Sequence, residues 1–366
     1  MRLALALALA AGIAAAASAD LDAIFAPLAD HNSPGVAVLV RQNGRTIYER
    51  GFGVRDLRTH GPIDARTDFR LASFTKQFTA MAVMLLVQGG KLRYDERLTD
   101  IYPDFPAYGH AITIRHLLTH TAGLPDYEEL MSSGGWTAEH QIQDNEVLEL
   151  LKQQSAGKFA PGSKWSYSNS GYVVLGAIVA KASGKSYGQY LDERIFRPLH
   201  MTHTVAYVKG ENTIPNRAYG HTKEGDKFTE TDQSASSATL GDGGVYSNLE
   251  DLARWDAALE HHMLLSEAEM RAALTPVRLD DGSEPHWPVA PNEDNLHPGK
   301  PVSYGFGWFL DPYQGHARMW HTGSSMGFRT VIERFTSDKL TVVVLCNRTD
   351  LDTGKLAEQS YGAIIR

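Results

Sequence analysis

Cysteine is almost absent from this sequence, since Cys346 is the single one among 366 residues. The chain can therefore form no intramolecular disulfide, even in an oxidising compartment. Cys346 ends an apolar run that is typical of a buried strand, so we expect it to act as a small hydrophobic residue and not as a nucleophile. Runs of Lys or Arg are also missing, and the net charge is −8. This charge pattern argues against a nucleic acid partner.

The long apolar run of the chain is at the N-terminus. Arg2 precedes an apolar run from Leu3 to Ala17, and Ala17-Ser18-Ala19 is a small-x-small site. This pattern is typical of a secretory signal peptide at residues 1–19, cleaved after Ala19, and the run is short for a membrane span. We therefore expect a periplasmic or secreted protein with no stable membrane insertion after cleavage.

Strand patterns lie at both ends of the chain. Residues 36–40 and 45–53 flank Asn43-Gly44, which is the signal of a type I′ hairpin turn. Residues 328–335 and 340–347 form a second strand pair, followed by a helix from about Asp352. Helical spacing or caps fill the middle, at 74–86, 114–120, 145–153, 171–182, 187–196 and 249–259.

This order of elements predicts an α/β fold of the α+β type. An antiparallel sheet from both chain ends is flanked by helices, and a mostly helical domain is inserted. We expect the sheet domain at 20–95 and 301–366 and the helical domain at 96–300. Residues 280–301 are rich in Pro, Asp and Asn without periodicity, which indicates a long polar surface loop.

A candidate nucleophile lies in Ser73-Phe-Thr-Lys76. Positions three apart share a helix face, so the Lys76 amine can reach the Ser73 hydroxyl and relieve it of its proton. An apolar helix follows, so Ser73 lies at a helix start, where N–H groups and the dipole favour an oxyanion. A second copy, Ser155-Ala-Gly-Lys158, has no apolar run behind it, and we interpret it as a turn.

Two further motifs supply polar groups. In Tyr167-Ser-Asn169 the phenol can shuttle a proton beside a lysine, and the Asn169 amide can hold a substrate amide. In a second copy, Tyr246-Ser-Asn248, Asn248 is a natural N-cap, so we interpret that copy as structural. His321-Thr322-Gly323 occurs once before Ser324, and a glycine on an edge strand would let a substrate backbone approach.

Two competing motifs are weaker. Ser325 lies in a G-x-S-x-G pattern, but that elbow needs a later histidine, and none follows His321. His116 and His120 have the spacing of metal ligands on a helix, but no H-E-x-x-H motif or third ligand is evident, so we interpret them as structural.

The three motifs, in this order, resemble the penicillin-recognising serine hydrolases. The similarity runs from about Pro34 to the C-terminus and includes four further blocks, Ile114 to Pro125, Pro161 to Asn169, Gly243 to Trp255 and Tyr304 to Trp308. The closest group resembles class C β-lactamases, DD-carboxypeptidases, family VIII esterases and D-amino-acid peptidases. The resemblance implies a β-lactamase/transpeptidase-like fold with Ser73 in a cleft between the two domains.

The resemblance also implies roles for individual residues. Ser73 would be acylated, Lys76 and Tyr167 would move protons, and Asn169 would orient the substrate. His321 stands where the family often has lysine and, with Thr322 and Gly323, would bind substrate. The N–H groups of Ser73 and Ser324 would form the oxyanion hole.

These roles predict a serine hydrolase that acts on ester or amide carbonyls, including D-peptide-like ones, without metal or organic cofactor. The alternatives are a β-lactamase and a non-catalytic penicillin-binding-type protein. The partner is a small-molecule or peptide substrate, and the sequence leaves the oligomeric state open. A histidine at position 321 with the usual pKa of ~6.5 would lose any attraction to a substrate carboxylate above that pH. In this family, histidine in place of the lysine is more common in peptidases and esterases than in potent β-lactamases, so the resemblance implies esterase or D-peptidase activity ahead of potent β-lactamase activity.

Overall fold

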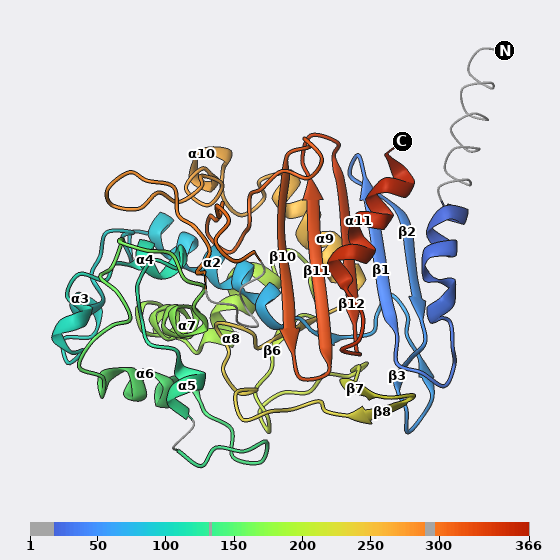
Figure 1. Cartoon of the computed structure of the whole chain (residues 1–366), viewed down its shortest axis with the longest axis horizontal. Helices are drawn as coiled ribbons and strands as arrows, with labels where there is room; N and C mark the ends of the chain where they lie inside the picture. Colours follow the sequence, from blue (N-terminus) through green and yellow to red (C-terminus); the bar gives the residue numbers. More distant parts are fainter. Residues whose placement is uncertain (1–17, 132–133, 290–296, 366) are drawn as a thin grey trace.

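The fold is built on a five-stranded antiparallel sheet with strand order β10-β11-β12-β1-β2 (Figure 1). The computed structural model describes residues 18–131, 134–289 and 297–365. The sheet contains the first two long strands and the last three, β1 (Val36–Gln42), β2 (Arg45–Phe52), β10 (Arg318–Ser325), β11 (Phe328–Phe335) and β12 (Leu340–Cys346). β1 pairs with β12 from Val36 opposite Cys346 to Gln42 opposite Leu340. The prediction of one antiparallel sheet from both chain ends is thus confirmed.

The expected hairpin turn has the backbone of its type. Asn43 and Gly44 both have positive φ, 52° and 74°, as a type I′ turn requires. The β1–β2 hairpin and the strand pair β11–β12 lie where the sequence predicts them. The two signals are local ones, so they needed no tertiary information.

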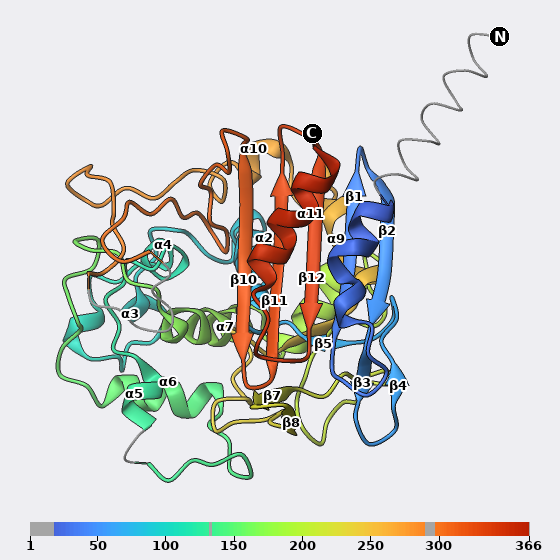
Figure 2. The same ribbon diagram turned by 45° about the vertical axis from the view of Figure 1, so that its right-hand side comes forward.

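Both faces of the sheet are covered. On one face, α11 (Thr353–Ile364) packs over β11 and β12, and the helical residues 18–25 lie over β1 and β2 (Figure 2). Alternate residues of β1, such as Val38 and Val40, belong to the buried cluster on this face. On the other face, α9 (Leu249–Glu260) contacts β1 and β12. Because both faces are buried, the strands β1 and β12 are apolar along nearly their whole length. Cys346 is buried in β12, as expected, and burial raises the pKa of its thiol to about 12.

Helices lie in the middle of the chain where the sequence predicts them. The six predicted segments are present as α2 (Lys76–Gln88), α4 (Ile114–Leu118), α6 (Asp144–Lys152), α7 (Asn169–Ser183), α8 (Tyr187–Leu191) with a π segment at Asp192–Phe196, and α9, and the shorter helices α3 (Leu98–Ile101), α5 (Tyr127–Met131) and α10 (Glu267–Met270) add to them. Three-residue or four-residue 3₁₀ segments lie at Ala26–Leu28, Ala72–Thr75 and Ala107–Gly109. α2 is buried from Lys76 to Leu86 and packs against α7, so it joins the sheet to the helices.

Short strands that the sequence analysis missed form three small sheets. One has the order β5-β9-β6, from Phe69–Arg70, Val245–Ser247 and Val205–Ala206. The others pair β3 (Val54–Asp56) with β4 (Gly61–Pro62) and β7 (His221–Glu224) with β8 (Lys227–Glu230). Strands of two to four residues are too short to show a clear period in the sequence, which is why a pattern search misses them.

Two segments expected from the sequence lie partly outside the described residues. The expected signal peptide lies, up to residue 17, outside the described residues. Among the described residues, no helix is long and apolar enough to cross a membrane. Part of the expected 280–301 loop, residues 290–296, is also outside the described residues. The loop is anchored by Trp287, which is buried and stacks on Phe309 with ring centroids 5.5 Å apart.

Candidate active site

The turn that carries Ser73 is short and strained. β5 ends at Arg70, and Ala72 then adopts a positive φ of 50°, which a residue with a side chain rarely takes. A 3₁₀ turn follows at Ala72–Thr75 and leads directly into α2. In a 3₁₀ turn the side chains at i and i+3 eclipse each other, so Ser73 and Lys76 are aligned. The Lys76 Nζ atom lies 2.9 Å from Ser73 Oγ.

Lys76 is fully buried, and its amine has three hydrogen-bond partners. Besides Ser73 Oγ, Nζ donates to Asn169 Oδ1 at 2.8 Å and to the Asp242 carbonyl at 3.0 Å. A neutral Lys76 amine has two N–H groups for the Asn169 and Asp242 oxygens and a lone pair for the Ser73 hydroxyl proton. The Tyr167 ring centroid lies 4.9 Å from Nζ. The amine is therefore fixed in position against the Ser73 hydroxyl.

The second motif, Tyr167-Ser168-Asn169, lies at the start of α7. Ser168 is the N-cap of α7, and its side chain accepts from the Gly171 N–H. Asn169 is the first residue of the helix, which places its amide on Lys76. Tyr167 precedes the cap, and its ring lies beside both Lys76 and the ring of His120, whose centroid is 4.4 Å away. The structure thus brings Ser73, Lys76, Tyr167 and Asn169 together.

The third motif lies on β10, the edge strand, which contacts the 3₁₀ turn of Ser73. Thr322 is half-buried and Ser324 is exposed, while His321 and Gly323 are buried. The expected edge position is confirmed, and the structure shows a further reason for the glycine. A Cβ at Gly323 would lie 2.0 Å from the Leu71 carbonyl oxygen and 2.3 Å from Thr330 Oγ1. The space beside Gly323 is filled by the backbone just before Ser73, so the glycine admits this turn.

His321 does not have the environment expected from the sequence. It is 1% exposed, and burial, with Lys76 nearby, lowers its pKa to about 3. Its Nδ1 lies 2.6 Å from the Thr322 carbonyl, which can only accept, so Nδ1 carries the proton. Its Nε2 then accepts from the Tyr304 hydroxyl at 3.2 Å. The expectation of a histidine that titrates near 6.5 is therefore wrong, because His321 is neutral over the physiological range.

The rival residues lie in other surroundings. Ser155 is in an irregular segment, and Lys158 pairs with Glu129 at 3.1 Å. His116 faces Asp280 at 3.8 Å, whereas His120 is buried beside Tyr167, so the two rings do not share one environment. Ser325 ends β10, and its buried hydroxyl has no hydrogen-bond partner among the described residues.

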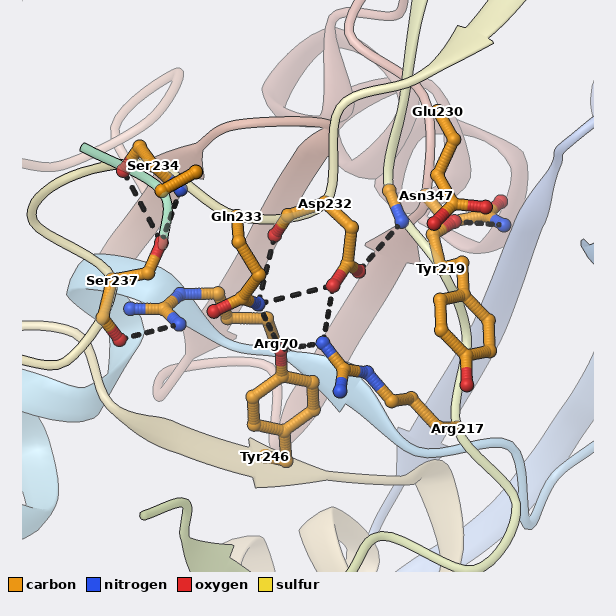
Figure 3. A network of polar contacts seen from close by, with 12 residues as sticks. Arg70, Arg217, Tyr219, Glu230, Asp232, Gln233, Ser234, Ser237, Tyr246 and Asn347 are labelled. Carbon is orange, nitrogen blue, oxygen red and sulfur yellow. Dashed lines mark hydrogen bonds and ion pairs between the residues drawn. The ribbon is translucent and has the colours of Figure 1, made fainter. Parts of the chain in front are cut away.

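The second tyrosine motif is part of a separate polar network (Figure 3). The Tyr246 hydroxyl contacts Arg217 Nη2 at 3.1 Å and Gln233 Nε2 at 3.4 Å. Arg217 also pairs with Asp232, and Arg70 donates to the Ser237 carbonyl at 3.1 Å. Asn248 caps α9 by accepting from the Asp251 N–H, as the sequence predicts. The network ties the 232–237 segment to β5 and β9, two strands that lie next to the Ser73 turn.

Several residues at the site were not singled out from the sequence for these contacts. Tyr304 holds His321, the Asp242 carbonyl holds Lys76, and Leu71 fills the space beside Gly323. Tyr304 lies in a block that had been noted for its resemblance alone, and Gly307 in that block has a φ of 75° and lies against the Lys76 carbonyl. Only glycine adopts this positive φ and this close approach at little cost, so Gly307 allows the block to pack against the start of α2.

Comparison with known proteins agrees with this geometry. The model of the Beta-lactamase family matches residues 21–362. The chain belongs to the Beta-lactamase family. Penicillin-binding protein 4* of Bacillus subtilis (strain 168) is 31% identical over 344 residues, which are 90% of this chain and 72% of that protein. The predicted resemblance is thereby confirmed, and with it the prediction of a serine hydrolase.

Solved structures confirm the predicted fold class. The D-amino acid amidase of Ochrobactrum anthropi SV3, complexed with L-phenylalanine, superposes with a TM-score of 0.76 at 24% identity, covering 94% of this chain and 98% of that one. EstCE1, described as a hydrolase with promiscuous acyltransferase activity, has a TM-score of 0.76 at 21% identity, covering 96% of this chain and 99% of that one.

Proposed function

We propose that this Beta-lactamase family protein hydrolyses ester or amide carbonyls, including D-peptide-like ones, through an acyl-Ser73 intermediate. The observation that carries the proposal is the 2.9 Å contact between Lys76 Nζ and Ser73 Oγ in a buried site. A serine hydroxyl needs a nearby base to become a nucleophile, and this amine is the group in place to serve.

The neighbouring groups support a two-step acyl transfer. Ser73 Oγ attacks the carbonyl carbon while its proton passes to Lys76 or Tyr167, and the same pair then protonates the leaving alcohol or amine. The N–H groups of Ser73 and Ser324 would stabilise the oxyanion. Water then attacks the acyl-serine and restores the hydroxyl. Asn169, Thr322 and Gly323 lie beside this path and would bind the substrate, with no metal or organic cofactor in any step.

The neutral state of His321 bears on the substrate. β-Lactams and C-terminal peptides present a carboxylate, which a lysine at this position would attract by charge. A buried neutral imidazole, with both nitrogens already bonded, supplies no such charge. We therefore favour esters and amides that lack this carboxylate, with β-lactam hydrolysis as the alternative. The names of the relatives, an amidase and a penicillin-binding protein, cover both possibilities.

A hydrolysis panel tests the proposal. Nitrophenyl esters, D-alanyl peptides and nitrocefin are offered to the protein and to the variants Ser73→Ala and Ser155→Ala. We expect turnover of esters or D-amides that Ser73→Ala abolishes and Ser155→Ala preserves. Mass spectrometry after fluorophosphonate treatment should find the adduct on Ser73. A folded protein without adduct and without turnover would instead indicate the non-catalytic, penicillin-binding alternative.

We also propose the setting in which this enzyme works. Residues 1–19 would direct export and be removed after Ala19, which leaves a periplasmic or secreted protein. N-terminal sequencing of the exported product should begin at Asp20. The sheet domain (20–95 and 301–366) and the helical domain (96–300) would meet at Ser73, so the site would lie in the cleft between them.

A further inference from the structure

His120 has a backbone conformation that its side chain does not favour. Its φ is 60°, in the left-handed region that glycine and asparagine occupy at less cost. The ring is 1% exposed. A strained residue of this kind persists where the surrounding structure holds it, and such positions concentrate at functional sites.

His120 forms hydrogen bonds with the residues on both sides of Tyr167 in the chain. The His120 carbonyl accepts from the Ser166 N–H at 3.0 Å, and the His120 Nδ1 accepts from the Ser168 N–H at 3.1 Å. These are the two residues that flank Tyr167 in the chain. The His120 ring also lies against the Tyr167 ring, with centroids 4.4 Å apart and planes tilted by 35°. One residue thus fixes both the backbone and the ring of Tyr167.

The same contact extends to Asn169. Ser168 is the N-cap of α7, so the bond from its N–H to His120 fixes the first turn of the helix. Asn169 begins that turn and accepts from Lys76 Nζ at 2.8 Å. A displacement of Ser168 would therefore move Tyr167 and Asn169, two of the residues that contact the Lys76 amine.

The protonation state of His120 follows from its hydrogen bond. Because the Ser168 N–H donates to Nδ1, the proton of the neutral ring is on Nε2. Nε2 is buried and has no hydrogen-bond partner among the described residues. Burial, with Lys76 and His321 nearby, lowers the His120 pKa well below its usual value. A protonated ring would place an N–H against the Ser168 N–H, so the contact requires the neutral form.

We infer that His120 is a positioning residue for Tyr167, holding the phenol in line for proton transfer through its Nδ1 acceptor and its ring. This inference rests on the proposed role of Tyr167 in the acyl-transfer reaction. Nε2 forms no hydrogen bond within the described part of the chain, so the hydrogen bonds of the His120 ring and carbonyl are those to the two residues that flank Tyr167.

Two variants separate the two contacts. His120→Phe keeps a ring and loses the acceptor. His120→Asn keeps an acceptor, tolerates the positive φ and loses the ring. We expect kcat for a nitrophenyl ester to fall in both, by as much as ~100-fold in His120→Phe, because a small misplacement of a reacting group has effects of this size. KM should change little. His221→Asn removes another buried histidine that lies in β7 and should leave kcat unchanged.

A double-mutant cycle with Tyr167→Phe tests whether His120 acts through Tyr167. If it does, His120→Phe should lower kcat by less than about 3-fold in the Tyr167→Phe background, within the usual error of additivity. The inference is overturned if His120→Phe lowers kcat by the same factor in the wild-type and Tyr167→Phe backgrounds. It is also overturned if His120→Phe and His120→Asn both keep the wild-type kcat. If His120→Phe does not fold, His120→Asn completes the same cycle. Turnover that survives Ser73→Ala would instead refute the proposed function itself.

Discussion

The carbonyl oxygen of Leu71 occupies the place that a side chain on Gly323 would need, since a Cβ there would lie 2.0 Å from it. The two residues belong to opposite parts of the sequence. Leu71 precedes Ser73 by two residues, and Gly323 lies on the strand that is proposed to bind the substrate. The absence of a side chain at Gly323 therefore allows the strand that is proposed to bind the substrate to lie close to the Ser73 turn.

Gly323→Ala should weaken both activity and stability. The added methyl group meets backbone, which cannot rotate away, so β10 must move from the Ser73 turn. We expect a loss of about 1–3 kcal/mol in the free energy of unfolding and of about 100-fold in kcat. Urea unfolding and ester hydrolysis measure these effects.

Gly362→Ala is the matched control for this substitution. Gly362 lies in α11, where an added Cβ would point into open space with no contact within 4 Å, and a helical alanine is favoured over glycine by about 1 kcal/mol. This variant should be slightly more stable and fully active. Equal behaviour of the two alanine variants would show that the Leu71 contact has no consequence.

Tyr167→Phe and Tyr246→Phe should have opposite effects. Loss of the Tyr167 hydroxyl removes a proposed proton-transfer group, so kcat should fall by about 10²–10⁴-fold with little change in stability. Loss of the Tyr246 hydroxyl leaves the half-buried Arg217 and Gln233 with one partner fewer, which costs about 1 kcal/mol. Its kcat per folded molecule should stay at the wild-type value. Similar small losses of activity in both variants would contradict the assignment of Tyr167.

His321 should make stability depend on pH. Its folded pKa of about 3 is lower than the usual value of about 6.5 in the unfolded chain, so the unfolded state binds more protons between these values. The stabilising contribution of the neutral His321 is fully present above pH ~6.5 and decreases as the pH falls toward ~3. At pH 5 the loss of stability from this residue is about 2 kcal/mol. In His321→Gln the decrease in stability from pH 7 to pH 5 should be smaller by this amount.

The same neutral state makes a kinetic prediction. KM values for substrates with and without a carboxylate should follow parallel pH profiles between pH 6 and 8, because His321 gains no charge in that range. A KM that rises with pH for carboxylate substrates alone would indicate a charged His321 and would contradict the structure. Initial-rate measurements on a paired ester and acid substrate provide the comparison.

Local signals made much of the fold predictable. The Asn43-Gly44 turn, the Asn248 cap and the spacing of Ser73 and Lys76 each depend on residues within a few positions of one another. The chain order of the motifs was sufficient for the family. Each of these features depends on a short stretch of sequence, in which the hydrophobic period or the turn and cap residues determine the local structure.

Contacts between distant residues were not predictable. The low pKa of His321 depends on burial and on the nearby Lys76, and no pattern in the sequence reports burial at a polar residue. The reason for Gly323 required the position of Leu71, which follows only from the packing of β10 on the 3₁₀ turn. The small sheet of β5, β9 and β6 was missed for a related reason, since its strands come from three separate segments.

The central place of β1 constrains how the chain can be made. β1 is among the first elements to leave the ribosome, yet one of its two neighbours, β12, is among the last. Next to this pair, the Gly35 N–H binds the side chain of Asn347, 312 residues later, at 2.8 Å. Contacts between such distant positions form slowly and only after synthesis is nearly finished. The nascent chain therefore contains Ser73 and Lys76 long before β10 is made and can pack against the Ser73 turn, so we expect no hydrolase activity before the C-terminal strands are complete.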